Sequence, residues 1–328
     1  MATDTDSGRP LCLFVIGMSR SGTSALARVL SLCGGALPNA LFGPSESNPR
    51  GHWEPQAALQ INDTILHRQG SSYHDPTLQL QEDGAFDADT KAACIAEIAA
   101  FLATLPPAPF VIIKEPRITA LSALWFQAAR LAGHGVASVV AVRHPQEVIA
   151  SLATRDRCSP ELASALWLKY NLLAERHTRG VPRVFVEYAN LLRNWRLETD
   201  RVSRALAINL RARDDLAIDR FLDRDLRHQN HRGPASEPFG TNWISAVDEM
   251  LRAAARDEPW NQCALDGIYE AYRASERTFR TALDDYRDRF TGTDWRLSVP
   301  KMIRAALPRP FRRSDPATDR FAAPSSRF

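Results

Sequence analysis

The sequence predicts an α/β fold in which a parallel sheet carries helices on both faces and is followed by a helical C-terminal third. Short, continuously apolar runs alternate with amphipathic segments up to about Tyr188, which is the pattern of parallel strands buried on both faces. The first run leads through a glycine-containing loop directly into a helical pattern. Beyond Tyr188, only helical periodicity continues.

Four apolar runs have the length and composition of buried strands. They are rich in β-branched residues and are bounded by proline, glycine or charged residues, which favours extended backbone. The predicted strands cover residues 11–17, 110–114, 136–143 and 181–188.

The segments between the runs carry apolar residues at helical spacing. Glycines end the first two segments, Pro145 begins a later one, and Ser159 with Pro160 caps and begins the next. The predicted helices cover residues 24–35, 55–69, 87–105, 121–131 and 145–152, and another begins at 160. A final amphipathic stripe consists of Leu265, Ile268, Tyr272, Phe279, Leu283, Tyr286 and Phe290.

The length of 328 residues suits one large domain. We expect a flexible leader at residues 1–10, a single domain at 11–295 with a helical part at 193–295, and a disordered tail at 296–328. The first ten residues lack the pattern of a signal peptide, and no apolar run is long enough to span a bilayer. The five cysteines are scattered and form no CxxC pair. A cytoplasmic location with reduced thiols is therefore expected.

The basic residues concentrate at the C-terminal end. From Lys301 onward there are seven cations and two acids, whereas the whole chain has a net charge of only +3. The body of the protein therefore lacks the charge of a nucleic-acid-binding surface, and no nucleic-acid partner is expected. The tail is interpreted as a solvated end, or alternatively as a peripheral contact with anionic membranes or other polyanions.

The loop GMSRSGTS, residues 17–24, partly matches a nucleotide-binding P-loop. Gly17 and Gly22 have the GxxxxG spacing, and Ser24 stands at the position of the motif's Ser/Thr. Thr23 replaces the motif's lysine, and a cation occurs earlier, at Arg20. A P-loop-like sheet that binds phosphate through loop N–H groups and the following helix N-terminus is predicted.

Further cations follow the ends of two other predicted strands. Lys114 ends one of them and Arg143 ends another, whereas no apolar run ends in the aspartate that would hold Mg²⁺ in a P-loop NTPase. Ser151 and Arg155 follow Arg143 and are helical neighbours on one face. The three side chains would close on one phosphate. The pattern favours a ligand with several anionic groups and a chemistry without a metal.

In these segments the sequence resembles sulfotransferases that use 3′-phosphoadenosine 5′-phosphosulfate (PAPS), particularly bacterial enzymes and the tyrosylprotein type. GMSRSGTS looks like their 5′-phosphosulfate loop, and RHPQEVIAS (143–151) looks like their 3′-phosphate segment. IKEPR (113–117) is similar to a Lys-Asp-Pro segment, with Glu115 in place of Asp. VEYANLL (186–192) is similar to a Tyr-Glu-Asp-Leu stretch, with Asn190 in place of the acid. The resemblance covers about residues 11–192, the expected cofactor-binding core.

The resemblance implies in-line, metal-independent transfer of a sulfuryl group from PAPS to an acceptor hydroxyl, with 3′-phosphoadenosine 5′-phosphate (PAP) as product. Arg20 and Lys114 would stabilise charge on the transferring group. The other residues implied in cofactor binding are Ser21, Gly22, Thr23, Ser24, Arg143, Ser151, Arg155 and Tyr188. A carbohydrate or glycolipid is the expected acceptor.

The general base is predicted to lie in SESNPRGHWEP (45–55), where Glu46, His52 and Glu54 are candidates. Glu54 occupies a place similar to that of the catalytic Glu of the tyrosylprotein type. A purely structural interpretation is that Glu54, next to Pro55, favours the start of a helix. Two other functions fit the motifs less well: a small-molecule kinase with a degenerate P-loop, and a non-catalytic protein that binds PAP and PAPS.

Overall fold

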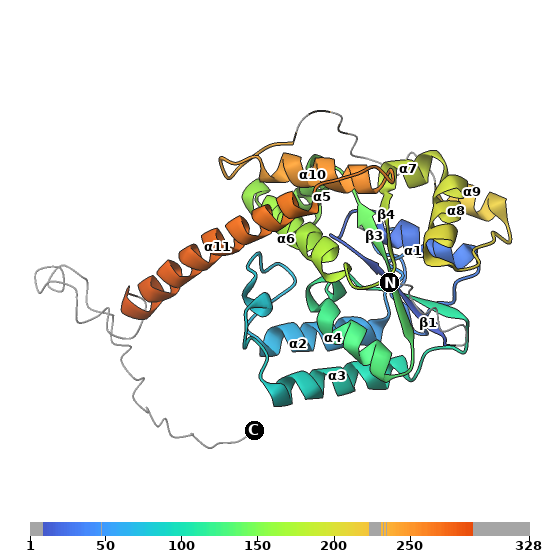
Figure 1. The fold of residues 1–328 in the computed structure, drawn as a ribbon, viewed down its shortest axis with the longest axis horizontal. Coiled ribbons are helices and arrows are strands. Elements are labelled where there is room, and N and C mark those ends of the chain that lie inside the picture. The colour runs from blue at the N-terminus through green and yellow to red at the C-terminus, as the bar shows by residue number, and fades with distance from the viewer. Residues whose placement is uncertain (1–8, 47, 223–230, 232, 234, 291–328) are drawn as a thin grey trace, which may run out of the picture. The chain divides into compact units, whose positions relative to one another are not determined.

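The computed structural model describes residues 9–46, 48–222, 231, 233 and 235–290 and contains a four-stranded, fully parallel sheet (Figure 1). The strands are β1 (Leu11–Ile16), β2 (Phe110–Lys114), β3 (Gly135–Val142) and β4 (Arg183–Glu187). Their order in the sheet is β2-β1-β3-β4. The carboxyl end of β1 therefore lies between those of β2 and β3. The predicted α/β class is confirmed, and each strand begins and ends within two residues of its predicted bounds.

The predicted helices also form. They are α1 (Thr23–Leu32), α2 (Gln56–Arg68), α3 (Ala88–Leu102), α4 (Ile118–Leu131), α5 (Pro145–Asp156) and α6 (Pro160–His177). The Ser159 side chain accepts a hydrogen bond from the N–H of Leu162, which confirms the predicted cap. After β4 come α7 (Tyr188–Arg193), α8 (Trp195–Leu206), α9 (Asp215–Phe221), α10 (Trp243–Ala254) and α11 (Gln262–Phe290), so among the described residues helices alone follow β4.

The alternation of side chains along the strands builds two separate cores. In β1, Cys12, Phe14 and Ile16 face one core, which includes residues of α3, α4, α6 and α10. Leu13 and Val15 face the other, which includes residues of α1, α7, α8 and α9. Because both faces are covered, the strands are mostly apolar, and two of them end in a charged residue, Lys114 in β2 and Glu187 in β4. Polar contacts with a ligand are therefore confined to the edge where the strands end.

The contacts within the chain divide it into two compact units, one up to Arg277 and one from Thr278 onward. In the first unit, Leu265 and Tyr272 at the start of α11 are buried. In the second, Phe279, Leu283 and Tyr286 of the same predicted stripe are exposed. The predicted tail at 296–328, the domain boundary at 295 and most of the leader lie outside the described residues.

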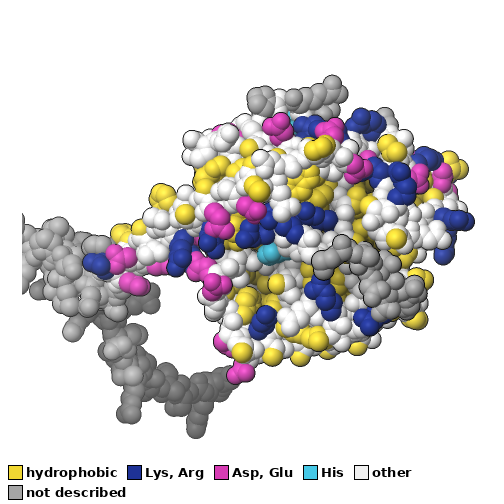
Figure 2. Space-filling view, in the orientation of Figure 1, with side chains coloured by type: hydrophobic (Ala, Val, Ile, Leu, Met, Phe, Trp, Pro, Cys, Tyr) yellow, Lys and Arg dark blue, Asp and Glu magenta, His cyan; other side chains and the backbone are white. Residues whose placement is uncertain are grey.

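Basic and acidic side chains lie beside each other on the face shown in Figure 2. Ion pairs join such side chains across distant parts of the chain as well as locally, as between Arg176 and Asp266 and between Arg179 and Glu175. Within the described part of the chain, no helix is both long and apolar enough to cross a bilayer.

The segment between α2 and the short 3₁₀ helix η1 (Gln79–Gln81) is held by buried side chains from other helices. Lys169 and Tyr170 of α6 donate to the carbonyls of Asp75 and Tyr73, at 2.7 and 3.0 Å. Tyr272 of α11 donates to the carbonyl of Pro76 at 2.7 Å. These bonds fix a segment that would otherwise be an ordinary surface loop.

Lys169→Met is expected to change how stability depends on pH. Burial lowers the pKa of Lys169 from 10.5 to about 8. Between these values the unfolded chain still holds a proton that the folded chain has released, so stability rises with pH. Relative to the variant, the wild type should gain free energy of unfolding from pH 8 toward pH 10.5. Urea unfolding at several pH values measures this difference, and parallel curves would contradict it.

Candidate active site

The loop between β1 and α1 is pressed against the sheet. Gly17 has φ +122°, and a Cβ there would lie 2.7 Å from the carbonyl oxygen of Ala141 in β3. Only glycine suits both the conformation and the space. Thr119 of α4 accepts from the N–H of Gly17 at 3.0 Å. The loop is therefore fixed at its first residue by two neighbouring elements.

Arg20 adopts the left-handed conformation, with φ 64°, which costs a residue with a Cβ about 1–2 kcal/mol. Its carbonyl accepts a 2.7 Å hydrogen bond from Arg143, and its Nε donates to Ser151 Oγ at 2.9 Å. The hydroxyl of the next residue, Ser21, is buried and makes no hydrogen bond to the described residues. Backbone held in this state is typical of a ligand-binding loop.

Helix α1 begins immediately after this loop without a side-chain cap. Gly22 is its N-cap residue, in the left-handed region, and among the described residues no side chain caps the first N–H groups. Those donors, with the positive end of the helix dipole, therefore favour an anion.

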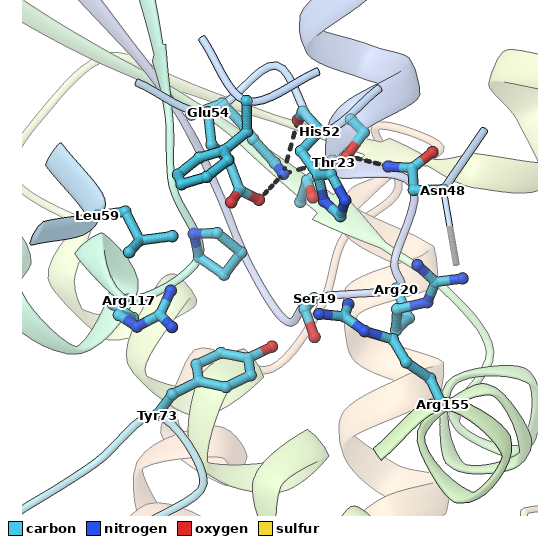
Figure 3. A pocket seen from close by; sticks show the side chains of 14 residues that line it. Ser19, Arg20, Thr23, Asn48, His52, Glu54, Leu59, Tyr73, Arg117 and Arg155 are labelled. Carbon is cyan, nitrogen blue, oxygen red and sulfur yellow. Dashed lines mark hydrogen bonds and ion pairs between the residues drawn. The ribbon is translucent and has the colours of Figure 1, made fainter. Parts of the chain in front are cut away.

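Two cavities of about 170 Å³ each lie at this edge of the sheet and share the residues Arg20, Thr23, Ser24 and Asn48. Cavity 1 has walls that include His52, Glu54, Tyr73, Lys114, Arg117 and Arg155 (Figure 3). Cavity 2 has walls that include Arg50, Arg143, Tyr188, Leu192, Phe221 and Leu222. The P-loop-like segment and the start of α1 thus form a wall common to both cavities.

Lys114 is the central contact of cavity 1. Its ammonium is 2% exposed and forms an ion pair with Glu54. It also donates to Ser24 Oγ and to the carbonyl of His52, both at 3.1 Å. Asn48 lies 3.4 Å from the same Ser24 hydroxyl. The end of β2, the start of α1 and the segment before α2 therefore meet at one buried charge.

Glu54 reaches cavity 1 from a pinned backbone. Its carbonyl accepts from Phe42 N–H at 2.8 Å, beside an isolated bridge between Leu41 and Pro55. Helix α2 begins at Gln56 with Pro55 as its N-cap, and no side chain caps it. The Glu54 carboxylate thus bonds Lys114, and the capping role that the sequence allowed is not observed.

The other two candidate bases are placed differently. His52 lines cavity 1 and lies 2.8 Å from Ser45 Oγ. Partial burial lowers its pKa, and the nearby Lys114 and Arg155 act in the same direction, against Glu54. Glu46 is exposed and lines neither cavity. The structure therefore brings Glu54 and His52 together and leaves Glu46 outside.

Cavity 2 combines charge with aromatic surface. Arg143 lies with its guanidinium carbon 4.9 Å from the Tyr188 ring centroid and pairs with the buried Glu147 at 2.7 Å. Phe221 and Leu222, at the end of α9, complete an apolar wall. Such a cavity suits a planar base beside a phosphate.

The three residues expected to close on one phosphate are only partly together. Arg143 lines cavity 2, Ser151 accepts from Arg20, and Arg155 lines cavity 1 instead. Arg155 lies one turn beyond Ser151 on α5, so its guanidinium reaches past Arg20 toward Ser19 (Figure 3). The three side chains therefore do not line one common cavity in this structure.

Sequence reasoning missed several cavity residues, notably Tyr73, Asn48 and Phe221. Tyr73 and Phe221 belong to no recognisable motif, and tertiary packing alone brings them to the cavities. Asn48 lies inside SESNPRGHWEP, where attention to side-chain amides would have found it. Among the described residues, no group of three or more His, Cys, Asp or Glu side chains is placed to hold a metal ion.

Glu115, which follows Lys114, does not reach the cavity. It is fully buried and accepts from Asn62 and Arg117, each at 2.5 Å. Asn62 in turn accepts from the indole of Trp125 at 2.8 Å. The carboxylate therefore holds Arg117 in place from behind.

Gly22→Ala is expected to destabilise the protein more than Gly70→Ala. Both glycines have left-handed φ values, +85° and +62°, which cost alanine about 1–2 kcal/mol. At Gly22 the new Cβ would also lie 2.3 Å from Tyr188 Cδ2, whereas nothing lies within 4 Å at Gly70. Overpacking adds about 1–3 kcal/mol. Chemical denaturation measures both variants, and equal losses would show that Tyr188 gives way freely.

No family model and no curated relative matches the sequence. Among solved structures, the sulfotransferase domain of the Synechococcus PCC 7002 olefin synthase matches 83% of this chain and 98% of its own, with 17% identity and a TM-score of 0.39. The sulfotransferase domain of the curacin biosynthetic pathway matches 80% of this chain and 97% of its own, with 17% identity and a TM-score of 0.38. The sulfotransferase STF9 from Mycobacterium avium matches 83% of this chain and 78% of its own, with 14% identity and a TM-score of 0.41. The chain thus has structural matches to several sulfotransferases.

Proposed function

We propose that the protein is a sulfotransferase that moves the sulfuryl group of PAPS to an acceptor hydroxyl. The observation that carries the proposal is the pair of cavities on either side of one phosphate-type loop. Cavity 2 offers Arg143 and aromatic surface, and cavity 1 offers Lys114 with the carboxylate of Glu54. A nucleotide with two separate anionic groups and a hydroxyl that needs a base would use these features together.

The residues present fit PAPS. The uncapped N–H groups of α1 would supply donors for the 5′-phosphosulfate. Ser21, whose hydroxyl is buried and lines neither cavity, would act by shaping the loop. Arg143 and Ser151 would hold the 3′-phosphate, and Tyr188 with Phe221 would flank the nucleoside. Within this scheme Gly22 and Thr23 act through their backbone, at the first turn of the helix. PAPS supplies an activated sulfuryl group and a stable leaving group.

Lys114 has the position that a metal ion has in related chemistry. In P-loop NTPases the Ser/Thr of the loop ligates Mg²⁺, whereas here the Ser24 hydroxyl lies 3.1 Å from the Lys114 ammonium. A fixed ammonium can stabilise charge on the transferring group and its bridging oxygen. Arg20, which also lines cavity 1, would add a second cation. The proposed reaction therefore requires no metal.

Glu54 is the proposed general base. It lies on the wall of cavity 1 and is held by Lys114, so its orientation is set before the acceptor arrives. Proton removal by a positioned group contributes about 10²–10⁴-fold to rate, and the remainder would come from alignment and charge stabilisation. His52, which shares the cavity, is the alternative base. The proposed acceptor is a hydroxyl group of a carbohydrate or glycolipid.

PAP is expected to raise the melting temperature without added metal, and Arg143→Ala should reduce its preference over adenosine 5′-phosphosulfate. Charge-assisted hydrogen bonds contribute about 1.5–3 kcal/mol, which sets the expected loss for PAP. Isothermal titration of both ligands gives the affinity ratio.

The ratio is the informative quantity because Arg143 also supports the loop through the carbonyl of Arg20. Damage to the loop would weaken both ligands equally, whereas loss of a 3′-phosphate contact weakens PAP alone. Ser151→Ala should change the ratio in the same direction. Stabilisation by ATP with Mg²⁺ but not by PAP would favour a kinase.

Glu54→Gln is expected to lower kcat by about 10²–10⁴-fold while PAPS still binds. The amide keeps an oxygen for Lys114 but accepts no proton from the acceptor. PAP release from PAPS in the presence of acceptor pools measures the rate, and thermal unfolding checks the fold. Glu46→Gln, outside both cavities, is the matched control. An inactive His52→Asn beside an active Glu54→Gln would assign the base to His52, and PAPS binding without PAP release would indicate a non-catalytic protein.

A further inference from the structure

We infer that the acceptor carries an anionic group close to its reacting hydroxyl, and that Arg155 and Tyr73 bind this group in cavity 1. The inference rests on the proposed function and names the substrate class for it. An acceptor with a carboxylate, sulfate or phosphate satisfies it, whereas a neutral carbohydrate does not.

Cavity 1 is lined by more basic than acidic side chains. Its lining contains Arg20, Lys114, Arg117 and Arg155 but only one acid, Glu54. Glu54 forms an ion pair with Lys114. Arg117 forms ion pairs with two acids that do not line the cavity, Glu115 and, at 2.6 Å, Asp63. Burial lowers the pKa of Arg20, and the charges of Arg155 and Arg143 lower it further. The cavity is therefore built for more negative charge than its own residues supply.

The Arg155 side chain lines cavity 1 and forms an ion pair only through its Nε among the described residues. Its Nε lies 3.2 Å from Asp156, its neighbour in the chain, and its two terminal nitrogens donate no hydrogen bond to a described residue. The side chain is 34% exposed and reaches the cavity beside Ser19 (Figure 3). A guanidinium with both terminal nitrogens available can bind a carboxylate or phosphate through two parallel hydrogen bonds.

Tyr73 is held rigidly in the same cavity, and its side chain reaches Ser19 as that of Arg155 does (Figure 3). Its ring lies under the Arg117 guanidinium, 4.8 Å from ring centroid to carbon, and packs against Tyr170 at 5.8 Å. Its hydroxyl points toward Ser19 and the cavity (Figure 3). Burial raises the pKa of Tyr73 to about 12, so the hydroxyl remains a hydrogen-bond donor.

The buried anchors behind Tyr73 show that this placement is specific. Lys169 is 1% exposed and donates to a main-chain carbonyl of the segment that carries Tyr73. Burying an ammonium costs free energy, and shape alone would not require it. Tyr170 holds the carbonyl of Tyr73 itself. The segment is thus a built wall of the cavity.

A neutral sugar needs both donors and acceptors around its hydroxyl groups. The wall that Tyr73, Arg117 and Arg155 form offers donors: the Tyr73 hydroxyl and the two guanidinium groups. Such a wall matches oxygen atoms that carry negative charge. The reacting hydroxyl would then lie toward Glu54, and the anionic group toward Arg155.

The experiment compares para-hydroxyphenylacetate with para-hydroxyphenylacetamide on the PAP-saturated protein, by isothermal titration. The two probes differ in charge but have nearly the same shape. The carboxylate should bind about tenfold or more tightly than the amide, the effect of one charged hydrogen bond. Arg155→Gln should remove the preference and leave PAP affinity unchanged. Tyr73→Phe, which keeps the ring on Arg117, should weaken the carboxylate more than the amide.

Arg130→Gln is the control for net charge, because Arg130 is an exposed residue at the end of α4. Equal binding of the two probes, no binding of the carboxylate, or a preference that survives Arg155→Gln would overturn the inference. So would a loss of PAPS affinity relative to PAP in Arg155→Gln, because the guanidinium would then bind the sulfuryl group. Failure of PAP itself to bind would instead overturn the proposed function.

Discussion

The buried ammonium of Lys114 is the contact on which the candidate site depends. A charge removed from water must be paired, and its partners here come from two other parts of the chain: Glu54 and the carbonyl of His52 before α2, and the Ser24 hydroxyl at the start of α1. These hydrogen bonds and the ion pair hold the end of β2, the start of α1 and the segment before α2 in one relative arrangement. That arrangement also creates the wall shared by the two cavities.

The segment before α2 has a double role because it contributes to both cavities. Pro49, Arg50 and Gly51 line cavity 2, His52 and Glu54 line cavity 1, and Asn48 lines both. Trp53 stabilises this segment from the outside, under the guanidinium of Arg28 at 4.4 Å and against the ring of Phe221. A change of the backbone along cavity 2 would therefore lie only a few residues from the proposed base.

The site also contains unfavourable interactions. Arg20 has a left-handed backbone, and its guanidinium lies near those of Arg143 and Arg155. The rigid sheet edge and the hydrogen bonds to the Arg20 carbonyl and side chain hold this arrangement. Anions bound at the loop would offset the repulsion, which is the electrostatic form of preorganisation.

The sequence by itself determined the sheet, its parallel direction and the loop at its edge, because these follow from local patterns. Continuous apolar runs specify strands that are buried on both faces. The spacing of Gly17 and Gly22 specifies the loop, and a side chain at either position would collide with Ala141 or Tyr188. The positions of Lys114 and Arg143 at strand ends followed from the same logic, since parallel strands end at one edge. Only the tertiary structure decided which cavity each side chain lines. Arg155 reaches cavity 1 because α5 is one turn longer than its apolar pattern predicts. Glu54 forms an ion pair with Lys114 because the fold brings the two side chains together. Tyr73 reaches the site because hydrogen bonds from α6 and α11 hold its segment. Contacts between residues 60 to 200 positions apart in the chain leave no local signal in the sequence.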